Sequence, residues 1–212
     1  FDNLKRIQNV FLNCYFKSLN TNSLFEELTS NKKIDFSRYK YFYASYVSST
    51  GRTNQAKNIV KSALKLYPRN LLLNQYKIDL NENKNISPFN CQKESHVAAE
   101  ILYITANALS TQSIYSLSNL YLNLAKYLNG DFHSFDILMA ENFYKINNFK
   151  KAKKKYRDLS KRGEAFDWYS TKQLARILIR EEKKDQAIQL ISNTYKDLKN
   201  KDIYETFDFA QF

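Results

Sequence analysis

The stretch that decides the fold runs from Ser37 to Asn70 and reads SRYKYFYASYVSSTGRTNQAKNIVKSALKLYPRN. Its first half predicts a helix that ends at Gly51, because glycine readily takes the left-handed conformation that follows many helix C-termini. Its second half predicts another helix, capped at its start by Thr53. Pro68 cannot continue this second helix. The stretch therefore predicts two antiparallel helices joined by a tight turn.

This unit of 34 residues resembles a tetratricopeptide repeat, a helix pair in which small residues allow close helix packing. The residues that carry the resemblance are Ala44, Gly51, Ala56, Ala63 and Pro68. A single helix pair cannot bury its own apolar face, so such pairs stack on one another. The resemblance implies an all-α fold, a right-handed α-solenoid of antiparallel helix pairs.

The same frame recurs downstream, in units that start near Ala99, His133 and Trp168. Small residues stand at the equivalent places of these units: Ala106, Ser118, Ala125, Ala140, Ala152, Ala175 and Ala187. Upstream, apolar spacing predicts a helix from Leu4 to Phe16. The pattern Ser23 to Glu26 is a capping box that would start a second helix.

The repeats suggest how the chain is divided. We expect N-terminal helix pairs over 1–86, made of a divergent pair (1–35), the close repeat (37–70) and an extra helix (71–82). Ser87-Pro88 should open a loop or hinge over 87–95. Three more pairs are expected over 96–200, and residues 201–212 form either a capping helix or the start of another repeat. Because the sequence begins with Phe1 instead of Met, we expect residues upstream of it in the gene.

A longer resemblance covers Arg38 to Ile191. It is to bacterial tetratricopeptide proteins that are often exported and have no established activity. The matching segments are ALKLYPRN (63–70), AAE (98–100), YLNLAKYL (121–128) and FKKAKKKY (149–156). The resemblance implies a periplasmic or envelope location over a cytoplasmic one, and it implies nothing about catalysis.

Composition leaves two interpretations of the charge. The formal net charge is +12, with the densest basic run at Lys150 to Arg157. Either the chain binds a polyanion, such as nucleic acid or an anionic surface, or its lysines reflect an AT-rich gene. No run of 18 apolar residues is present, so no transmembrane segment is expected.

Catalytic patterns are missing from the sequence, and we predict that the chain is not an enzyme. His96 and His133 have no carboxylate or cysteine at ligand spacing, so we expect no metal and no cofactor. The three glycines are isolated and form no phosphate-binding loop. For Cys14 and Cys91 we expect packed free thiols, with a single bridge as the alternative.

The function expected is a protein-interaction scaffold that holds a peptide or helix of a partner in a concave groove. The resemblance implies a groove lined by the first helix of each pair. Lys172, Arg176 and Arg180 share one helix face there and favour an acidic partner. A basic nucleic-acid or surface binder, or a structural part of a longer repeat protein, remain the alternatives. The groove residues predicted are Arg38, Tyr41, Ser45, Tyr103, Asn107, Glu141, Tyr144, Tyr169, Lys172, Arg176 and Arg180.

Overall fold

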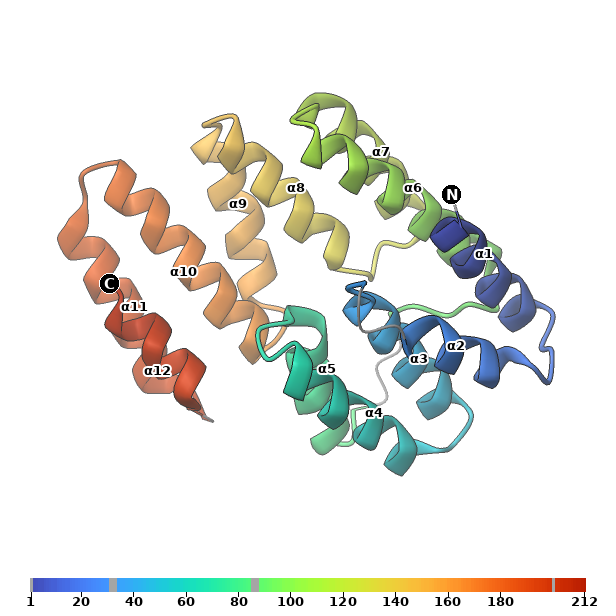
Figure 1. The fold of residues 1–212 in the computed structure, drawn as a ribbon. Helices are drawn as coiled ribbons and strands as arrows, with labels where there is room; N and C mark the ends of the chain where they lie inside the picture. Colours follow the sequence, from blue (N-terminus) through green and yellow to red (C-terminus); the bar gives the residue numbers. More distant parts are fainter. Residues whose placement is uncertain (1, 31–33, 85–87, 200) are drawn as a thin grey trace. The chain divides into compact units, whose positions relative to one another are not determined.

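A computed structural model of the chain describes residues 2–30, 34–84, 88–199 and 201–212. These residues form helices and connecting turns, with no strand among them, so the prediction of an all-α fold is confirmed (Figure 1). The helices are α1 (Asp2–Tyr15), α2 (Thr21–Ser30), α3 (Ser37–Ser49), α4 (Thr53–Leu66), α5 (Leu71–Asn81), α6 (Glu94–Thr111), α7 (Tyr115–Leu128), α8 (Ser134–Lys145), α9 (Phe149–Ser160), α10 (Glu164–Arg180), α11 (Lys184–Asp197) and α12 (Ile203–Ala210).

The chain divides into two compact units. Unit 1 comprises Phe1–Ile104 and Leu124–Phe132, and unit 2 comprises Thr105–Asn123 and His133–Phe212. The boundary between them falls within α6 and α7. The hinge predicted at 87–95 stays a prediction, and its first residue, Ser87, lies outside the described residues.

One turn geometry follows six of the helices. After α3, Gly51 has a φ of 83°, its N–H donates to the carbonyl of Ser48, and the next N–H donates to Val47. These two bonds make a Schellman turn, which satisfies carbonyls at the helix end. The same left-handed conformation recurs at five residues that are not glycine, namely Lys17, Asn83, Ser113, Asn147 and Glu182. The turn of the close repeat (37–70) therefore recurs after helices that have no glycine at the left-handed position.

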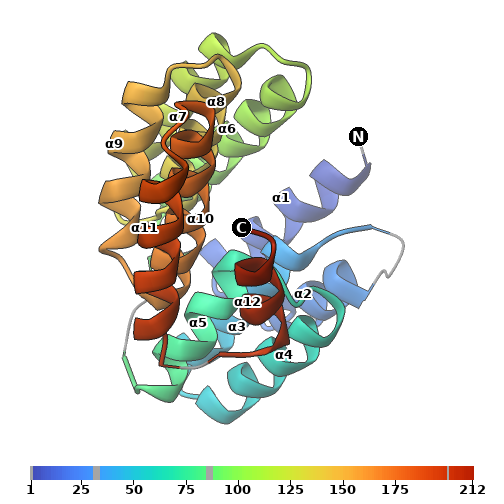
Figure 2. The ribbon, with the colours of Figure 1, turned by 90° about the vertical axis from the view of Figure 1, so that its left-hand side faces the viewer.

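The turns define helix pairs. A second helix starts within a few residues of the turn in the pairs α1/α2, α3/α4, α6/α7, α8/α9 and α10/α11. Within unit 2, α8 to α11 lie side by side in both views (Figures 1 and 2). The small residues predicted to allow this packing are fully buried, including Ala44, Ala106, Ala140 and Ala175. The structure thus shows stacked helix pairs, as the sequence predicts.

Two of the predicted helix caps are wrong. Thr53 is the first residue of α4, and Arg52 takes the cap position without a side-chain bond. The second N-terminal helix, α2, begins at Thr21, before the predicted capping box. There the hydroxyl of Ser23 donates to the carbonyl of Asn20 instead of capping a backbone N–H. Ser and Thr have this local alternative, which the sequence pattern does not distinguish from a cap.

The left-handed turn at Glu182 leads to a stability prediction. A residue with a Cβ is strained in this conformation, whereas glycine is not. Glu182→Gly should therefore raise the free energy of unfolding by about 0.5–1 kcal/mol, net of the entropy that glycine adds to the unfolded chain. Glu182→Ala removes the same charge but keeps the Cβ, so it should bring no gain. Urea unfolding followed by circular dichroism compares the two, and equal effects would contradict the strain argument.

Aromatic side chains form the core of unit 1. Phe42 lies 4.1 Å from Phe89 and 5.6 Å from Phe132, measured between ring centroids. Phe11 of α1 contacts both Phe42 and Phe89, at 5.7 and 5.4 Å. Phe89 and Phe132 lie in connecting segments, so these segments are held by the same core as the helices. Such rings contribute large apolar areas to folding.

A disulfide joins Cys14 to Cys91, so the expectation of free thiols is wrong. Their Cα atoms are 5.8 Å apart across a sequence separation of 77. Cys14 lies on the buried face of α1, as the apolar spacing predicts. The packing of Phe89 against Phe11 brings the following residues, including Cys91, alongside α1. Pairing of two distant cysteines depends on this contact, which spacing alone does not reveal.

Unit 2 has an apolar core and a buried polar network. Tyr156 and Ile177 are buried in the core with Ala140, Ala152 and Leu174. At the junction of α6, α7 and α8, the fully buried Asn142 donates to Ser118 and Asn119 and accepts from Ser110. The hydroxyl of Ser118 in turn donates to the carbonyl of Ala106. Ser118 stands where the pairs α3/α4, α8/α9 and α10/α11 have alanine, and its hydrogen bonds in this network give it a structural role.

Candidate partner-binding surface

In unit 1, Arg38 belongs to a buried ion pair and not to an open surface. Its guanidinium donates to both carboxylate oxygens of Glu100, at 2.7 and 2.5 Å. The Arg38 side chain is 15 % exposed and that of Glu100 is 0 % exposed. Burial raises the pKa of the Glu100 carboxyl, against the opposing effect of the Arg38 charge. Burial is the largest influence on the pKa of Arg38 and lowers it, but the combined effect of Glu100, Tyr103 and Tyr39 raises it overall.

The other groove residues predicted in unit 1 surround this pair or lie deeper. The ring of Tyr103 covers the guanidinium of Arg38 at 3.6 Å from its centroid. Tyr41 is 3 % exposed, because its ring stacks on Phe132 and contacts Tyr76. Ser45 is 2 % exposed. Tyr41 and Ser45 are therefore corrected from surface residues to parts of the unit 1 interior, and the partly exposed Arg38 is engaged in its ion pair.

In unit 2, three of the predicted residues are engaged within the unit. The hydroxyl of Tyr169 donates to the carboxylate of Glu141 at 2.6 Å. Burial raises the pKa of both groups. Lys172 forms an ion pair with Asp208 of α12, and its ammonium group also lies close to the ring of Trp168 on α10. The basic ladder predicted on α10 is therefore neutralised at its first member.

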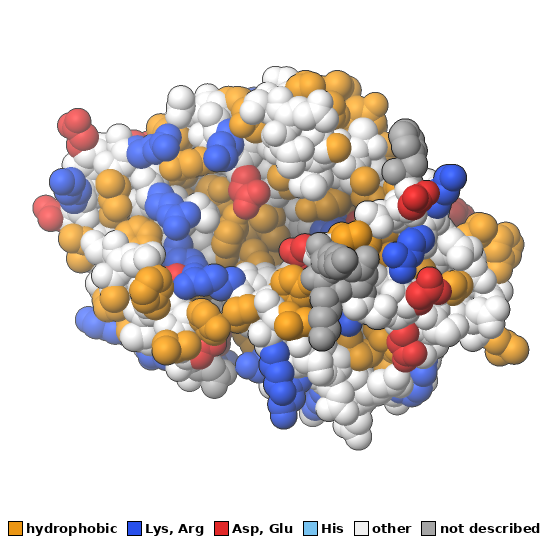
Figure 3. All heavy atoms as spheres, viewed as in Figure 1, with side chains coloured by type: hydrophobic (Ala, Val, Ile, Leu, Met, Phe, Trp, Pro, Cys, Tyr) orange, Lys and Arg blue, Asp and Glu red, His pale blue; other side chains and the backbone are white. Residues whose placement is uncertain are grey.

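The remaining members of the ladder are exposed. Arg176 and Arg180 stand one turn apart on α10. The guanidinium of Arg180 lies 4.7 Å from the ring centroid of Tyr144 on α8, and it donates to Asn147. In the part of the chain that the structure describes, neither arginine has an acidic partner. We name Tyr144, Arg176 and Arg180 the arginine patch; Figure 3 shows Lys and Arg side chains along the surface where Figure 1 places α10.

Two predicted features lie outside the arginine patch. Asn107 is exposed on α6. The basic run of α9 is partly neutralised, because Lys153 pairs with Glu181 and Lys155 pairs with Asp136. The cations that stay exposed on α9 include Lys150, Lys154 and Arg157. Fewer charges are thus available for a polyanion than the sequence run indicates.

The histidines have local structural contacts. The Nδ1 atom of His96 accepts a hydrogen bond from the N–H of Asn90 at 3.1 Å. The ring of His133 packs edge-on against Phe166. Within the described ranges, no group of three or more His, Cys, Asp or Glu side chains could hold a metal ion. Among those same residues, no helix is both long enough and apolar enough to span a bilayer.

No protein-family model matches the chain, and no curated protein matches it in sequence. Among solved structures, it is similar to one described as "MamA RS-1 ArsTM double mutant". The sequence identity is 13 %, the match covers 92 % of this chain and 94 % of the other, and the TM-score is 0.36. At that similarity it supports no inference about function.

A second surface, in unit 1, was missed by the sequence analysis. A cleft of about 480 Å³ lies between α4 and α5. Its lining combines apolar side chains with lysines from both helices, and its residues are Lys57, Val60, Lys61, Leu64, Lys65, Lys77, Leu80 and Asn81. The spacing of Lys57, Lys61 and Lys65 places them on one face of α4, which is a signal that the sequence does contain.

Proposed function

We propose that the chain is a non-catalytic protein-interaction scaffold whose arginine patch binds an acidic segment of a partner. The observation that carries this proposal is the pair of exposed guanidinium groups one turn apart on α10, of which one is stacked on Tyr144. Guanidinium groups bind carboxylates bidentately. Tyrosine and arginine are also the side chains that contribute most often to binding energy at protein interfaces.

Neutralisation within the unit supports the choice of these residues. Lys172 already has Asp208 as its partner, and Lys153 and Lys155 of α9 are paired as well. Arg176 and Arg180 keep their charge for an external group. Arg176 and Arg180 are about 6 Å apart along the helix axis, which is roughly one helical turn. A peptide that presents two carboxylates at this spacing would match the two arginines.

The double variant Arg176→Glu/Arg180→Glu should reduce capture of the partner from native extract at least about tenfold, since each lost charge pair is replaced by repulsion. A matched control is Lys150→Glu/Lys154→Glu, which makes the same change in net charge on the exposed face of α9. Labelled protein is immobilised, and the bound partner is quantified by mass spectrometry. Unchanged capture by the α10 variant would remove the arginine patch from the function.

The α9 control also tests the nucleic-acid alternative. If the chain binds a polyanion through α9, Lys150→Glu/Lys154→Glu should weaken retention on heparin, and retention by the unsubstituted chain should fall steeply with salt. The paired state of Lys153 and Lys155 argues for the scaffold instead.

We infer further that the chain works in an oxidising compartment, such as the periplasm or cell envelope. The support is the disulfide between Cys14 and Cys91, because disulfides are rare in reducing cytoplasm. Thiol labelling of the protein in intact cells tests the location. Two free thiols on protein taken from its native compartment would contradict it.

A further inference from the structure

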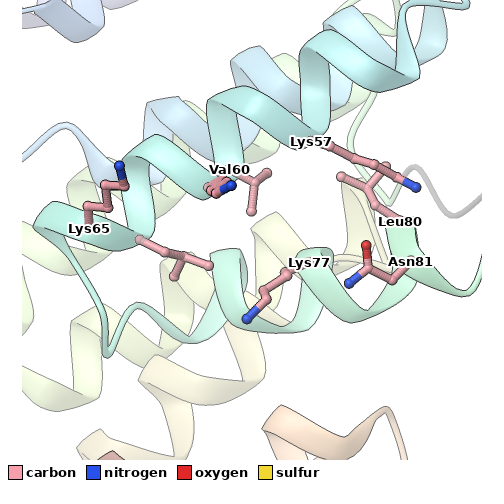
Figure 4. Close-up of a pocket in the computed structure, with 8 residues that line it drawn as sticks. Lys57, Val60, Lys65, Lys77, Leu80 and Asn81 are labelled. Carbon is pink, nitrogen blue, oxygen red and sulfur yellow. The ribbon is translucent and has the colours of Figure 1, made fainter. Parts of the chain in front are cut away.

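The cleft between α4 and α5 carries an uncompensated positive charge. Lys57, Lys61 and Lys65 come from α4 and Lys77 comes from α5, and no acidic residue is among the described residues that line the cleft (Figure 4). Of the described residues, none forms an ion pair with any of these four lysines. Elsewhere in the chain, Lys153, Lys155 and Lys172 have internal partners.

The cleft also has an apolar floor. Val60 of α4 and Leu80 of α5 form its base (Figure 4), and the half-buried Leu64 also lines the cleft. The lysines of α4 extend from Lys57 to Lys65, which corresponds to roughly 12 Å along the helix axis. A row of cations of this length beside an apolar floor fits about two turns of an amphipathic helix with acidic flanks.

The turns at the ends of six helices indicate which element does not follow α5 among the described residues. Five helices that end in the left-handed turn are followed within a few residues by a second helix. The sixth, α5, ends in the same turn at Asn83, but the next helix in the described chain begins only at Glu94. A second helix for α5 would pack against α5 and beside the preceding α4, and these are the helices that line the cleft.

We propose that the cleft binds an acidic amphipathic helix of a partner protein, which takes the place of the second helix that does not follow α5 in the described residues. The apolar side chains of the bound helix cover Val60, Leu64 and Leu80, and its carboxylates face the four lysines of the cleft. This surface lies in unit 1 and uses none of the residues of the arginine patch, so the two sites can fail separately.

The proposal is tested with a phage-displayed library of helical peptides in which the charged and apolar positions are randomised. Selection against the full chain should enrich peptides with an apolar stripe flanked by Glu and Asp. Lys61→Glu/Lys77→Glu should weaken the selected peptides at least about tenfold. The control Lys150→Glu/Lys154→Glu alters net charge equally, and Arg176→Glu/Arg180→Glu alters the other surface; both should bind as the unsubstituted chain does. Circular dichroism confirms that every variant is folded.

Two further measurements distinguish binding of an acidic amphipathic helix from binding of other anionic ligands. Leu64→Ser should also weaken the peptides, because the apolar floor contributes to binding only if an apolar face covers it. Vesicles containing phosphatidylglycerol and a single-stranded oligonucleotide are assayed in parallel. The proposal is overturned if selection enriches no acidic amphipathic peptide, if the α9 control loses binding equally, or if Lys61→Glu/Lys77→Glu releases the vesicle or oligonucleotide but not the peptides.

Discussion

Loss of the disulfide between Cys14 and Cys91 is expected to lower the free energy of unfolding by about 4 kcal/mol. The bond closes a long loop, with a sequence separation of 77, so its removal restores much conformational freedom to the unfolded chain. Both cysteines are buried, Cys14 completely, and no other cysteine is available to exchange with them.

Cys91→Ser and reduction of the unsubstituted chain should therefore shift the urea midpoint by the same amount. The measurement is urea unfolding with and without dithiothreitol. Cys14→Ser/Cys91→Ser is the control, because reductant should not change its midpoint. If reductant leaves the unsubstituted chain unaffected as well, the bond makes no contribution to stability in solution.

Removal of one partner from the ion pair between Arg38 and Glu100 should also have a large effect. Arg38→Met leaves a completely buried carboxylate without its cation, and Glu100→Met leaves a guanidinium without its anion. Loss of one partner of a buried pair costs about 3–5 kcal/mol. Arg38→Met also removes the packing of the guanidinium beneath the ring of Tyr103.

A double variant separates the pair from its surroundings. Arg38→Met/Glu100→Met replaces both charges by apolar side chains, so it should destabilise the unit less than the sum of the two Met variants. Thermal unfolding of the four proteins gives the coupling energy. If the losses in the free energy of unfolding are additive, the two side chains act independently. If each single variant loses less than about 1 kcal/mol, the pair contributes no more than a surface ion pair does.

The sequence predicts the helix pairs because their physical requirements are local. Gly51 and Pro68 mark a turn and a helix end, and buried small residues such as Ala44 and Ala106 are needed wherever two helices approach closely. The later turns are less visible. Ser113 and Glu182 take the same left-handed conformation as Gly51 and make the same pair of backbone hydrogen bonds at the helix end.

The candidate site was predicted less well, since exposure depends on residues far away in the sequence. Tyr41 occupies a groove position by repeat resemblance, yet Phe132 stacks on it from 91 positions further along the chain. Lys172 has the same helix face as Arg176, but Asp208 neutralises it. Residue spacing gives the face of a helix on which a side chain lies, but does not reveal what covers that face.

The buried network around Asn142 has a consequence for assembly of the chain. Because the helix pairs all use similar small apolar residues, a first helix could dock against the wrong neighbour, a typical failure of repeat proteins during folding. Asn142 is satisfied only when Ser110, Ser118 and Asn119 are opposite it. A shift by one turn would leave buried polar groups unbonded, at about 1–3 kcal/mol each. The network therefore favours a single register for the packing of α8 against α6 and α7.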